Sequence, residues 1–277
     1  MKNNPEIHYR SFIFGSSRSS VFYSKEWGKY INDSLVFHFD ASNEDIIGIS
    51  QKVKFIAAQG NRIENALLVF DGETFEPSAD FENSIIHKRD WRQSGENRIV
   101  YHLKFFAAFF KNQYFIKFFD AKINEVYKSN MWGALEGKHM IYTPSHNDFI
   151  FQGYIDEIKK DSLAYYARDL FYPRSGELQF QNERIDEEDL EELHAIQEVF
   201  KAHKTKVKIV ISPSFDQESI NPADLKILKE MFGEQHVFDA SGVNKYTNEL
   251  GNFYEIYHYK PLVANQILSD MYEALDQ

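Results

Sequence analysis

The feature that constrains the fold most is a short, uninterrupted apolar segment from Ala66 to Phe70. A strand with one face in water alternates apolar and polar residues, so a continuous apolar run indicates a strand covered on both faces. Parallel sheets flanked by helices on both sides provide that environment. We therefore predict that Asn65 to Phe70 forms a central strand of a parallel sheet.

Segments typical of strands and of amphipathic helices alternate on both sides of this run. Further strands are predicted at 8–14, 35–39, 206–212 and 236–239. The predicted helices are 19–31, 44–59 and three that begin at Asp186, at Asn221-Pro222 and at Pro261. Five strands alternating with helices imply an α/β fold with right-handed crossovers, a three-layer α/β/α arrangement of the flavodoxin-like type around a parallel five-stranded sheet.

The alternation stops after Phe75. Residues 76–185 are predicted to be a large, mainly helical insertion after the third strand, within a single domain that spans 1–277. Inside it, 101–127 has a helical pattern rich in phenylalanine, whereas 139–181 is less regular. A chain of 277 residues with 43% apolar residues can bury a core large enough for one domain of this kind.

Composition excludes several classes of function. The 31 Lys and Arg against 42 Asp and Glu give a net charge of -11, which argues against nucleic acid as a partner. The absence of cysteine excludes disulfides, thiolate metal sites and a cysteine nucleophile. The scattered histidines lack the spacing of a metal site, so we expect neither a metal nor another cofactor. Because the N-terminus is polar, we expect no signal peptide in this chain. Because no long apolar run is present, we expect no transmembrane segment in it either.

The first segment with recognisable chemistry is Gly15-Ser16-Ser17-Arg18, where the first strand turns into the first helix. Ligands of open parallel sheets bind at the carboxyl ends of the strands. A serine there lies near the backbone N–H groups of a helix N-terminus, which stabilise an oxyanion. The same residues also suit a simple tight turn, or a phosphate-binding turn of a flavodoxin-like protein.

The second segment is Glu255-Ile256-Tyr257-His258, just before the last helix. A carboxylate three residues ahead of a histidine can hold one ring nitrogen while the other accepts a proton from a serine. The alternative is a surface loop rich in aromatic residues with an incidental glutamate and histidine. The catalytic interpretation requires that this segment and Gly15-Ser16-Ser17 meet at one edge of the sheet.

Together, these two segments resemble the SGNH (GDSL-like) serine hydrolases, which carry a Gly-x-Ser block after the first strand and a D-x-x-H block before the last helix. The resemblance implies that Ser17 is the nucleophile, His258 the general base and Glu255 the residue that replaces the family's aspartate. The Gly-Ser-Ser-Arg variant, with His258-Tyr259 and Pro261 late in the chain, is similar to bacterial envelope members that take part in the acylation of surface polysaccharides.

The family's remaining two blocks supply a glycine and an asparagine to the oxyanion hole, and neither block is matched here. The chain has Asp40-Ala41-Ser42-Asn43 after the second strand and Asp71-Gly72-Glu73 after the third. By position, the side chain of Asn43 and the backbone of Gly72 are the candidates to assist the backbone N–H of Ser17. Arg18 is expected either to bind an anionic group of the substrate or to pair with an acidic residue.

The resemblance implies a serine esterase or O-acyltransferase that acts on an acyl ester, with a surface glycan as the implied substrate. It also implies the bacterial envelope as location if a membrane anchor has been removed, and otherwise the cytoplasm. A membrane-bound acyltransferase is the implied partner, and the aromatic segment 105–110 is then a candidate docking or acyl-chain surface. The alternatives are a catalytically inactive module that binds glycan or protein, and the phosphate binder.

Overall fold

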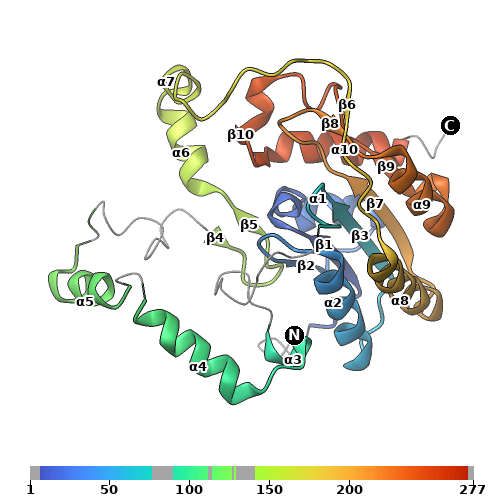
Figure 1. Ribbon diagram of the computed structural model, residues 1–277, viewed down its shortest axis with the longest axis horizontal. Helices are drawn as coiled ribbons and strands as arrows, with labels where there is room; N and C mark the ends of the chain where they lie inside the picture. The colour runs from blue at the N-terminus through green and yellow to red at the C-terminus, as the bar shows by residue number, and fades with distance from the viewer. Residues whose placement is uncertain (1–6, 77–89, 112–113, 127, 129–140, 274–277) are drawn as a thin grey trace.

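The computed structural model describes residues 7–76, 90–111, 114–126, 128 and 141–273. Its centre is a five-stranded sheet in which every pair of neighbouring strands is parallel (Figure 1). The strands are β1 (Ser11–Gly15), β2 (Val36–Asp40), β3 (Asn65–Phe70), β7 (Lys206–Ile211) and β9 (Val237–Asp239), in the order β2-β1-β3-β7-β9. This is one of the two common orders of doubly wound sheets. The predicted α/β fold with a parallel five-stranded sheet is confirmed.

Strand β3 lies in the middle of this sheet, with the predicted boundaries. It pairs with β1 on one side and with β7 on the other, and all six of its residues are buried. Successive side chains point to opposite faces. Leu68 and Phe70 therefore join one hydrophobic core, and Leu67 and Val69 join the other. The two cores account for the uninterrupted apolar run.

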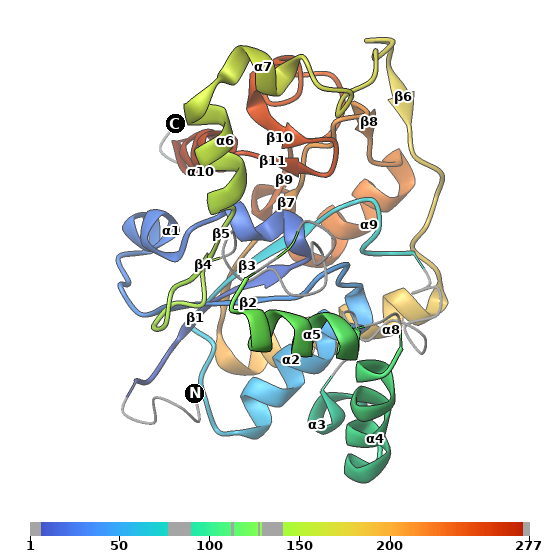
Figure 2. The ribbon, with the colours of Figure 1, turned by 90° about the vertical axis from the view of Figure 1, so that its left-hand side faces the viewer.

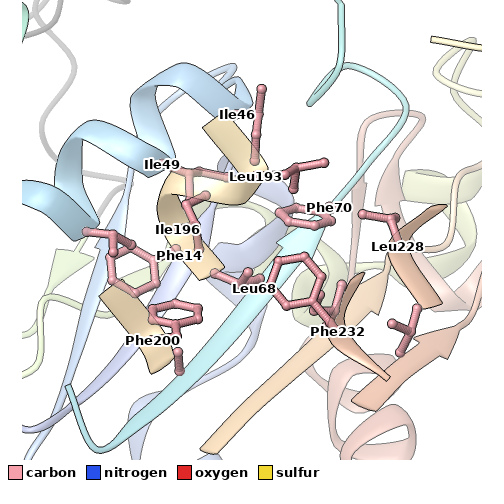
Figure 3. Packing of buried hydrophobic residues seen from close by; sticks show 14 of the residues in the cluster. Phe14, Ile46, Ile49, Leu68, Phe70, Leu193, Ile196, Phe200, Leu228 and Phe232 are labelled. Carbon is pink, nitrogen blue, oxygen red and sulfur yellow. The ribbon is translucent and has the colours of Figure 1, made fainter. Parts of the chain in front are cut away.

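Helices cover both faces of the sheet, so the fold has three layers (Figure 2). One face packs against α2 (Ile46–Ala58), α8 (Glu187–His203) and α9 (Pro222–Phe232). Figure 3 shows this core, in which Ile49 of α2 and Ile196 of α8 lie over the sheet residues Phe14 and Leu68. The other face packs against α1 (Ser24–Ile31) and α10 (Pro261–Glu273).

The helix starts follow local capping signals. Asp186 caps α8: its side chain accepts a hydrogen bond from the Asp189 N–H at 3.0 Å, and the Asp189 side chain accepts one from the Asp186 N–H at 3.2 Å. Asn221 caps α9 through the Ala223 N–H at 2.9 Å, with Pro222 as the first helical residue. These side chains satisfy N–H groups that have no partner within the helix. The predicted starts at Asp186 and at Asn221-Pro222 are confirmed.

The prediction of one continuous helix over 19–31 is wrong. The segment divides into a 3₁₀ helix, η1 (Ser17–Val21), and α1, which starts at Ser24. Serine hydroxyls bond back to the backbone here, Ser19 to the Ser16 carbonyl and Ser20 to the Ser17 carbonyl. Such bonds compete with a regular α-helix. The chain then turns at Phe22, whose side chain is fully buried.

The predicted helix over 101–127 is also divided, into α4 (Arg98–Phe109) and α5 (Tyr114–Asn124), and Tyr127 lies outside the described residues. The ring centroids of Phe109 and Phe118 are 5.7 Å apart. Nine residues of one straight helix would separate them by about 13 Å along its axis. The break therefore allows the two short helices to pack through their phenylalanine rings.

The rest of the predicted insertion forms short elements around the sheet; its residues 77–89 and 129–140 lie outside the described part of the chain. The turn between β4 (Ile141–Tyr142) and β5 (Phe149–Ile150) covers the edge of the sheet at β2, where the His38 N–H donates to the His146 carbonyl at 2.8 Å. The described elements of this region are α3 (Trp91–Ser94), β4 (Ile141–Tyr142), β5 (Phe149–Ile150), α6 (Gln152–Lys160), α7 (Ser162–Tyr166) and β6 (Gln179–Phe180).

Short elements also follow β7 in the chain. They are β8 (Glu218–Ser219), which pairs with β6, two 3₁₀ helices, η3 (Glu234–His236) and η4 (Leu250–Asn252), and the strands β10 (Phe253–Glu255) and β11 (His258–Tyr259). Strands β10 and β11 pair with each other outside the central sheet. Across the described ranges, no helix is both long and apolar enough to cross a bilayer.

Replacing Leu68 with alanine tests the central position of β3. Leu68 is fully buried, so the lost contacts and the residual cavity should lower the free energy of unfolding by about 2–5 kcal/mol in urea titrations. Leu262→Ala is the matched control, because that side chain is 60% exposed and its loss should cost below about 0.5 kcal/mol. Equal losses in the two variants would contradict the assignment of the core.

Asp189 of the α8 cap should make stability depend on pH. Burial raises the pKa of Asp189 to about 6, whereas an aspartate in an unfolded chain titrates near about 4. Between these values the folded state binds more protons than the unfolded state, so this group lowers stability as pH rises from about 4 to about 6. Asp189→Asn removes the contribution. The unfolding free energy of the variant relative to wild type should therefore increase over that interval, and a pH-independent difference would contradict this expectation.

Candidate active site

Ser17 lies at the carboxyl end of β1, at the start of η1. Ser16 is the capping residue: its hydroxyl accepts a hydrogen bond from the Arg18 N–H at 3.2 Å and donates one to the buried Asp71. Gly15 precedes this turn, and a Cβ atom on it would lie 2.6 Å from the Val69 carbonyl oxygen of β3. Glycine is therefore required for β1 and β3 to approach so closely. The turn buries Ser16 and leaves Ser17 half-buried.

Glu255 and His258 face each other across a tight hairpin. Glu255 ends β10, His258 begins β11, and the two are register partners separated by a turn of only two residues. Side chains of directly opposed residues lie on the same face of a hairpin. A two-residue turn places residues i and i+3 opposite each other, so the hairpin brings the carboxylate of Glu255 next to the imidazole of His258.

The hairpin meets η1, and three side chains form a continuous chain of hydrogen bonds. The Nε2 atom of His258 lies 2.9 Å from Oγ of Ser17, and Nδ1 bonds to Oε1 of Glu255. An ionised carboxylate only accepts hydrogen bonds, so Nδ1 carries a proton. In the neutral imidazole, Nε2 is then free to accept a proton from the Ser17 hydroxyl. The second carboxylate oxygen of Glu255 accepts the Tyr257 N–H at 2.8 Å, which fixes its orientation.

Arg18 connects three loops around the hydrogen-bonded residues Ser17, His258 and Glu255. Its Nε donates to the Tyr257 carbonyl at 3.2 Å, and its guanidinium lies 3.7 Å from both Asp71 and Glu73. Burial acts to lower the pKa of Arg18, but the nearby carboxylates outweigh this effect and raise it above its usual value. Of the two expectations for Arg18, the structure shows the ion pair. Arg18 therefore links the turn that carries Ser17 to the hairpin that carries Glu255 and His258.

Aromatic side chains from 149–166 support the hairpin from the other side. The ring of Phe151 packs against the imidazole of His258, with centroids 4.7 Å apart, and Tyr154 stacks on Tyr254 at 5.6 Å. The hydroxyls of Tyr165 and Tyr166 donate to backbone carbonyls of β10, at 2.6 and 3.1 Å. Burial, followed by the charge of Glu255, raises the pKa of Tyr154.

None of these four aromatic residues was identified from the sequence. A signal for two of them was present: Phe151, Tyr154, Ile155 and Ile158 recur every three or four residues, as on the apolar face of a helix.

A second serine–histidine pair begins two residues after Ser17 and is closed to solvent. Oγ of Ser19 lies 2.9 Å from Nε2 of His38, and Nδ1 of His38 lies 3.6 Å from Asp148. Ser19 and His38 are fully buried. Burial raises the pKa of Asp148, but the interactions with His38 and Ser24 outweigh it and keep that pKa below its usual value. This network, also missed from the sequence, joins β2, η1 and α1 to the turn after β4.

The two other oxyanion candidates make no hydrogen bond with Ser17 or His258. Asn43 is exposed in the turn after β2, with a left-handed backbone (φ 51°). Gly72 follows β3; its carbonyl accepts a hydrogen bond from Arg184, and a Cβ atom there would lie 2.7 Å from the amide of Gln181. Over the described ranges, no group of His, Asp or Glu side chains is arranged to hold a metal ion.

Comparison of the chain with family models, with curated proteins and with solved structures found no match. The resemblance therefore rests on the two short sequence blocks alone.

Replacing Arg18 with glutamine should destabilise the site, because Asp71 is buried and would lose its cation. Removing one partner of a buried pair costs about 3–5 kcal/mol. The matched control is Arg168→Gln, whose pair with Glu157 is shorter, at 2.6 Å, but about half exposed. An exposed pair contributes below about 1 kcal/mol, so the control should lose far less stability in urea titrations.

Hydrogen exchange gives a local measurement for the same pair of variants. Arg18→Gln should accelerate amide exchange in 253–260, whereas Arg168→Gln should leave this hairpin protected. Unchanged exchange in the Arg18 variant would show that Arg18 does not hold the hairpin.

Proposed function

We propose that this chain is a serine esterase or O-acyltransferase of the SGNH type, which acts on an acyl ester through Ser17, His258 and Glu255. The observation that carries the proposal is the continuous contact from the Ser17 hydroxyl through the imidazole to the carboxylate. Nucleophile, base and orienting carboxylate are within direct reach of each other, which is the arrangement that activates a serine. The order of the sheet and the resemblance in the two sequence blocks support the same class.

In the proposed mechanism, Oγ of Ser17 attacks the acyl carbonyl while Nε2 of His258 takes the hydroxyl proton. His258 then gives this proton to the departing alcohol, whose bond to the acyl carbon breaks, and an acyl-serine remains. Water or an acceptor hydroxyl next attacks the acyl carbon and loses its proton to His258. The bond to Ser17 breaks, and the serine recovers the proton. Glu255 stays ionised throughout and stabilises the imidazolium that forms in each half-reaction.

The oxyanion of each tetrahedral intermediate needs hydrogen-bond donors. The N–H of Ser17 is in the first turn of η1, where backbone donors lack partners within the helix. By position, the side chain of Asn43 and the N–H of Gly72 are the remaining candidates. Because one such donor is worth about 10²–10³-fold in rate, their contribution decides whether the enzyme is fast or slow.

The surroundings of Ser17 suit a substrate that approaches from solvent. A cavity of about 10 Å³ lies beside Arg18, Asp71 and Ser212, but it has room for about one water molecule and Ser17 does not line it. Beside His258, the side chain of Tyr257 is 59% exposed. Ser17 and His258 are themselves only partly buried, so an acyl group carried on a large acceptor, such as the surface glycan that the resemblance implies, can approach them from solvent.

The test combines a fluorophosphonate probe with hydrolysis of p-nitrophenyl acetate. Wild type should be labelled on Ser17, as located by mass spectrometry, and should hydrolyse the ester. Ser17→Ala and His258→Ala should lose labelling and at least about 10³-fold in kcat/KM, because the members of a triad act as a unit. Glu255→Gln should also lose activity, because it removes the charge that stabilises the imidazolium.

Ser19→Ala is the matched control, since Ser19 also lies beside a histidine but is sealed from the probe. It should keep the label on Ser17. A folded wild type that is neither labelled nor active would contradict the proposed enzymatic function. It would favour the alternative of an inactive module that binds glycan or protein. Binding of inorganic phosphate that persists in His258→Ala would favour the phosphate binder.

A further inference from the structure

Helices α4 and α5 expose an apolar stripe that the described part of the chain leaves uncovered. No residue of α4 is buried, and in α5 only Ala121 is. Along α4 the exposed positions recur every three or four residues, which places them on one face. The large apolar residues of 98–124 that are more than half exposed are Ile99, Leu103, Phe106, Phe110, Ile116 and Ile123. Figure 1 shows both helices projecting away from the central sheet.

The two helices form a unit of their own. Phe109 contacts Phe118 and Phe115 with ring centroids 5.7 and 6.0 Å apart, so part of the aromatic surface is used between the helices. The exposed stripe is what remains after this packing. Large exposed apolar patches mark surfaces that bind a partner or a membrane.

The charge of this unit is opposite to that of the protein. Residues 98–124 contain five Lys or Arg and one Asp, a charge of +4, within a chain whose net charge is -11. Arg98 lies on α4, and Lys117 and Lys122 lie on α5, whereas Lys104 of α4 is paired with Glu96 at 2.6 Å. Such a surface attracts an anionic partner, whereas the same surface of a second copy would bring positive charges together.

We propose that α4 and α5 bind the interface of an anionic lipid bilayer, with the exposed stripe inserted among the headgroups and the basic residues against the lipid charges. Amphipathic helices with basic residues and bulky apolar residues bind bilayers in this way. Neither helix is long enough to span the membrane: α4 has 12 residues and α5 has 11, so each is shorter than about 20 Å. They would therefore lie in the plane of the interface. The proposal does not depend on catalysis by Ser17.

The test is flotation of the full chain with vesicles of phosphatidylcholine alone and of phosphatidylcholine mixed with phosphatidylglycerol. Wild type should bind the anionic vesicles, bind the neutral vesicles at least tenfold more weakly, and be released by high salt. The double substitution Leu103→Asn, Phe106→Asn should reduce binding to anionic vesicles at least tenfold. Lys117→Glu should weaken it and reduce its salt dependence.

Two control variants separate this surface from general changes in polarity and charge. Leu163→Asn removes an apolar side chain that is 85% exposed on α7, and Lys25→Glu makes the same charge change on α1. Both controls should bind anionic vesicles within about twofold of wild type. All variants should keep the circular dichroism spectrum and the fluorophosphonate labelling of wild type, so a failure here is distinguishable from a failure of the catalytic proposal.

Three outcomes would overturn the proposal. The first is a folded wild type that binds neither kind of vesicle, as expected if a soluble protein is the partner. The second is equal binding by wild type and the Leu103/Phe106 variant. The third is a wild-type dimer that this variant converts to a monomer without any binding to vesicles, which would identify the stripe as a contact between copies.

Discussion

The two-sided burial of β3 is the constraint on which the rest of the structure depends. Its side chains supply both hydrophobic cores, so both faces of the sheet are covered by helices, and the neighbouring strands run parallel to it. Parallel strands end at the same edge. That edge therefore collects the turn after β1, which carries Ser17, and the turn after β3, which carries Asp71 and Glu73.

The contacts across this edge are made by charged and aromatic side chains rather than by the sheet. Arg18 joins the two turns to the Tyr257 carbonyl of the histidine hairpin. On the opposite side, Phe151 and the hydroxyls of Tyr165 and Tyr166 hold the same hairpin. The region between β3 and α8, which does not contribute to the central sheet, therefore takes part in positioning His258 and Glu255.

Much of this arrangement was predictable from local signals. The apolar run specifies β3 itself, and the capping residues Asp186 and Asn221 specify the helices that begin directly after them. Such signals involve only neighbouring residues, so they can be recognised in the sequence alone. The division of 19–31 was missed because serine hydroxyls also bond to the backbone carbonyls of η1 and so compete with a regular α-helix. The His38 network was missed for a different reason: Asp148 is 110 residues from His38 in the chain, and only the folded sheet edge brings them together. Phe151 and Tyr165 were missed because they contact a hairpin far along the chain, and a helical pattern does not reveal such a partner.

The short turn between β10 and β11 has a consequence for how the site responds to motion. Glu255 and His258 are opposed on the same hairpin, so a rigid displacement of that hairpin moves acid and imidazole together and preserves the bond between them. The contact with Ser17, by contrast, joins residues 241 positions apart in the chain. In the proposed mechanism, fluctuations of the hairpin would thus interrupt proton transfer only between Ser17 and His258, while the bond to Glu255 continues to fix the tautomer of the histidine.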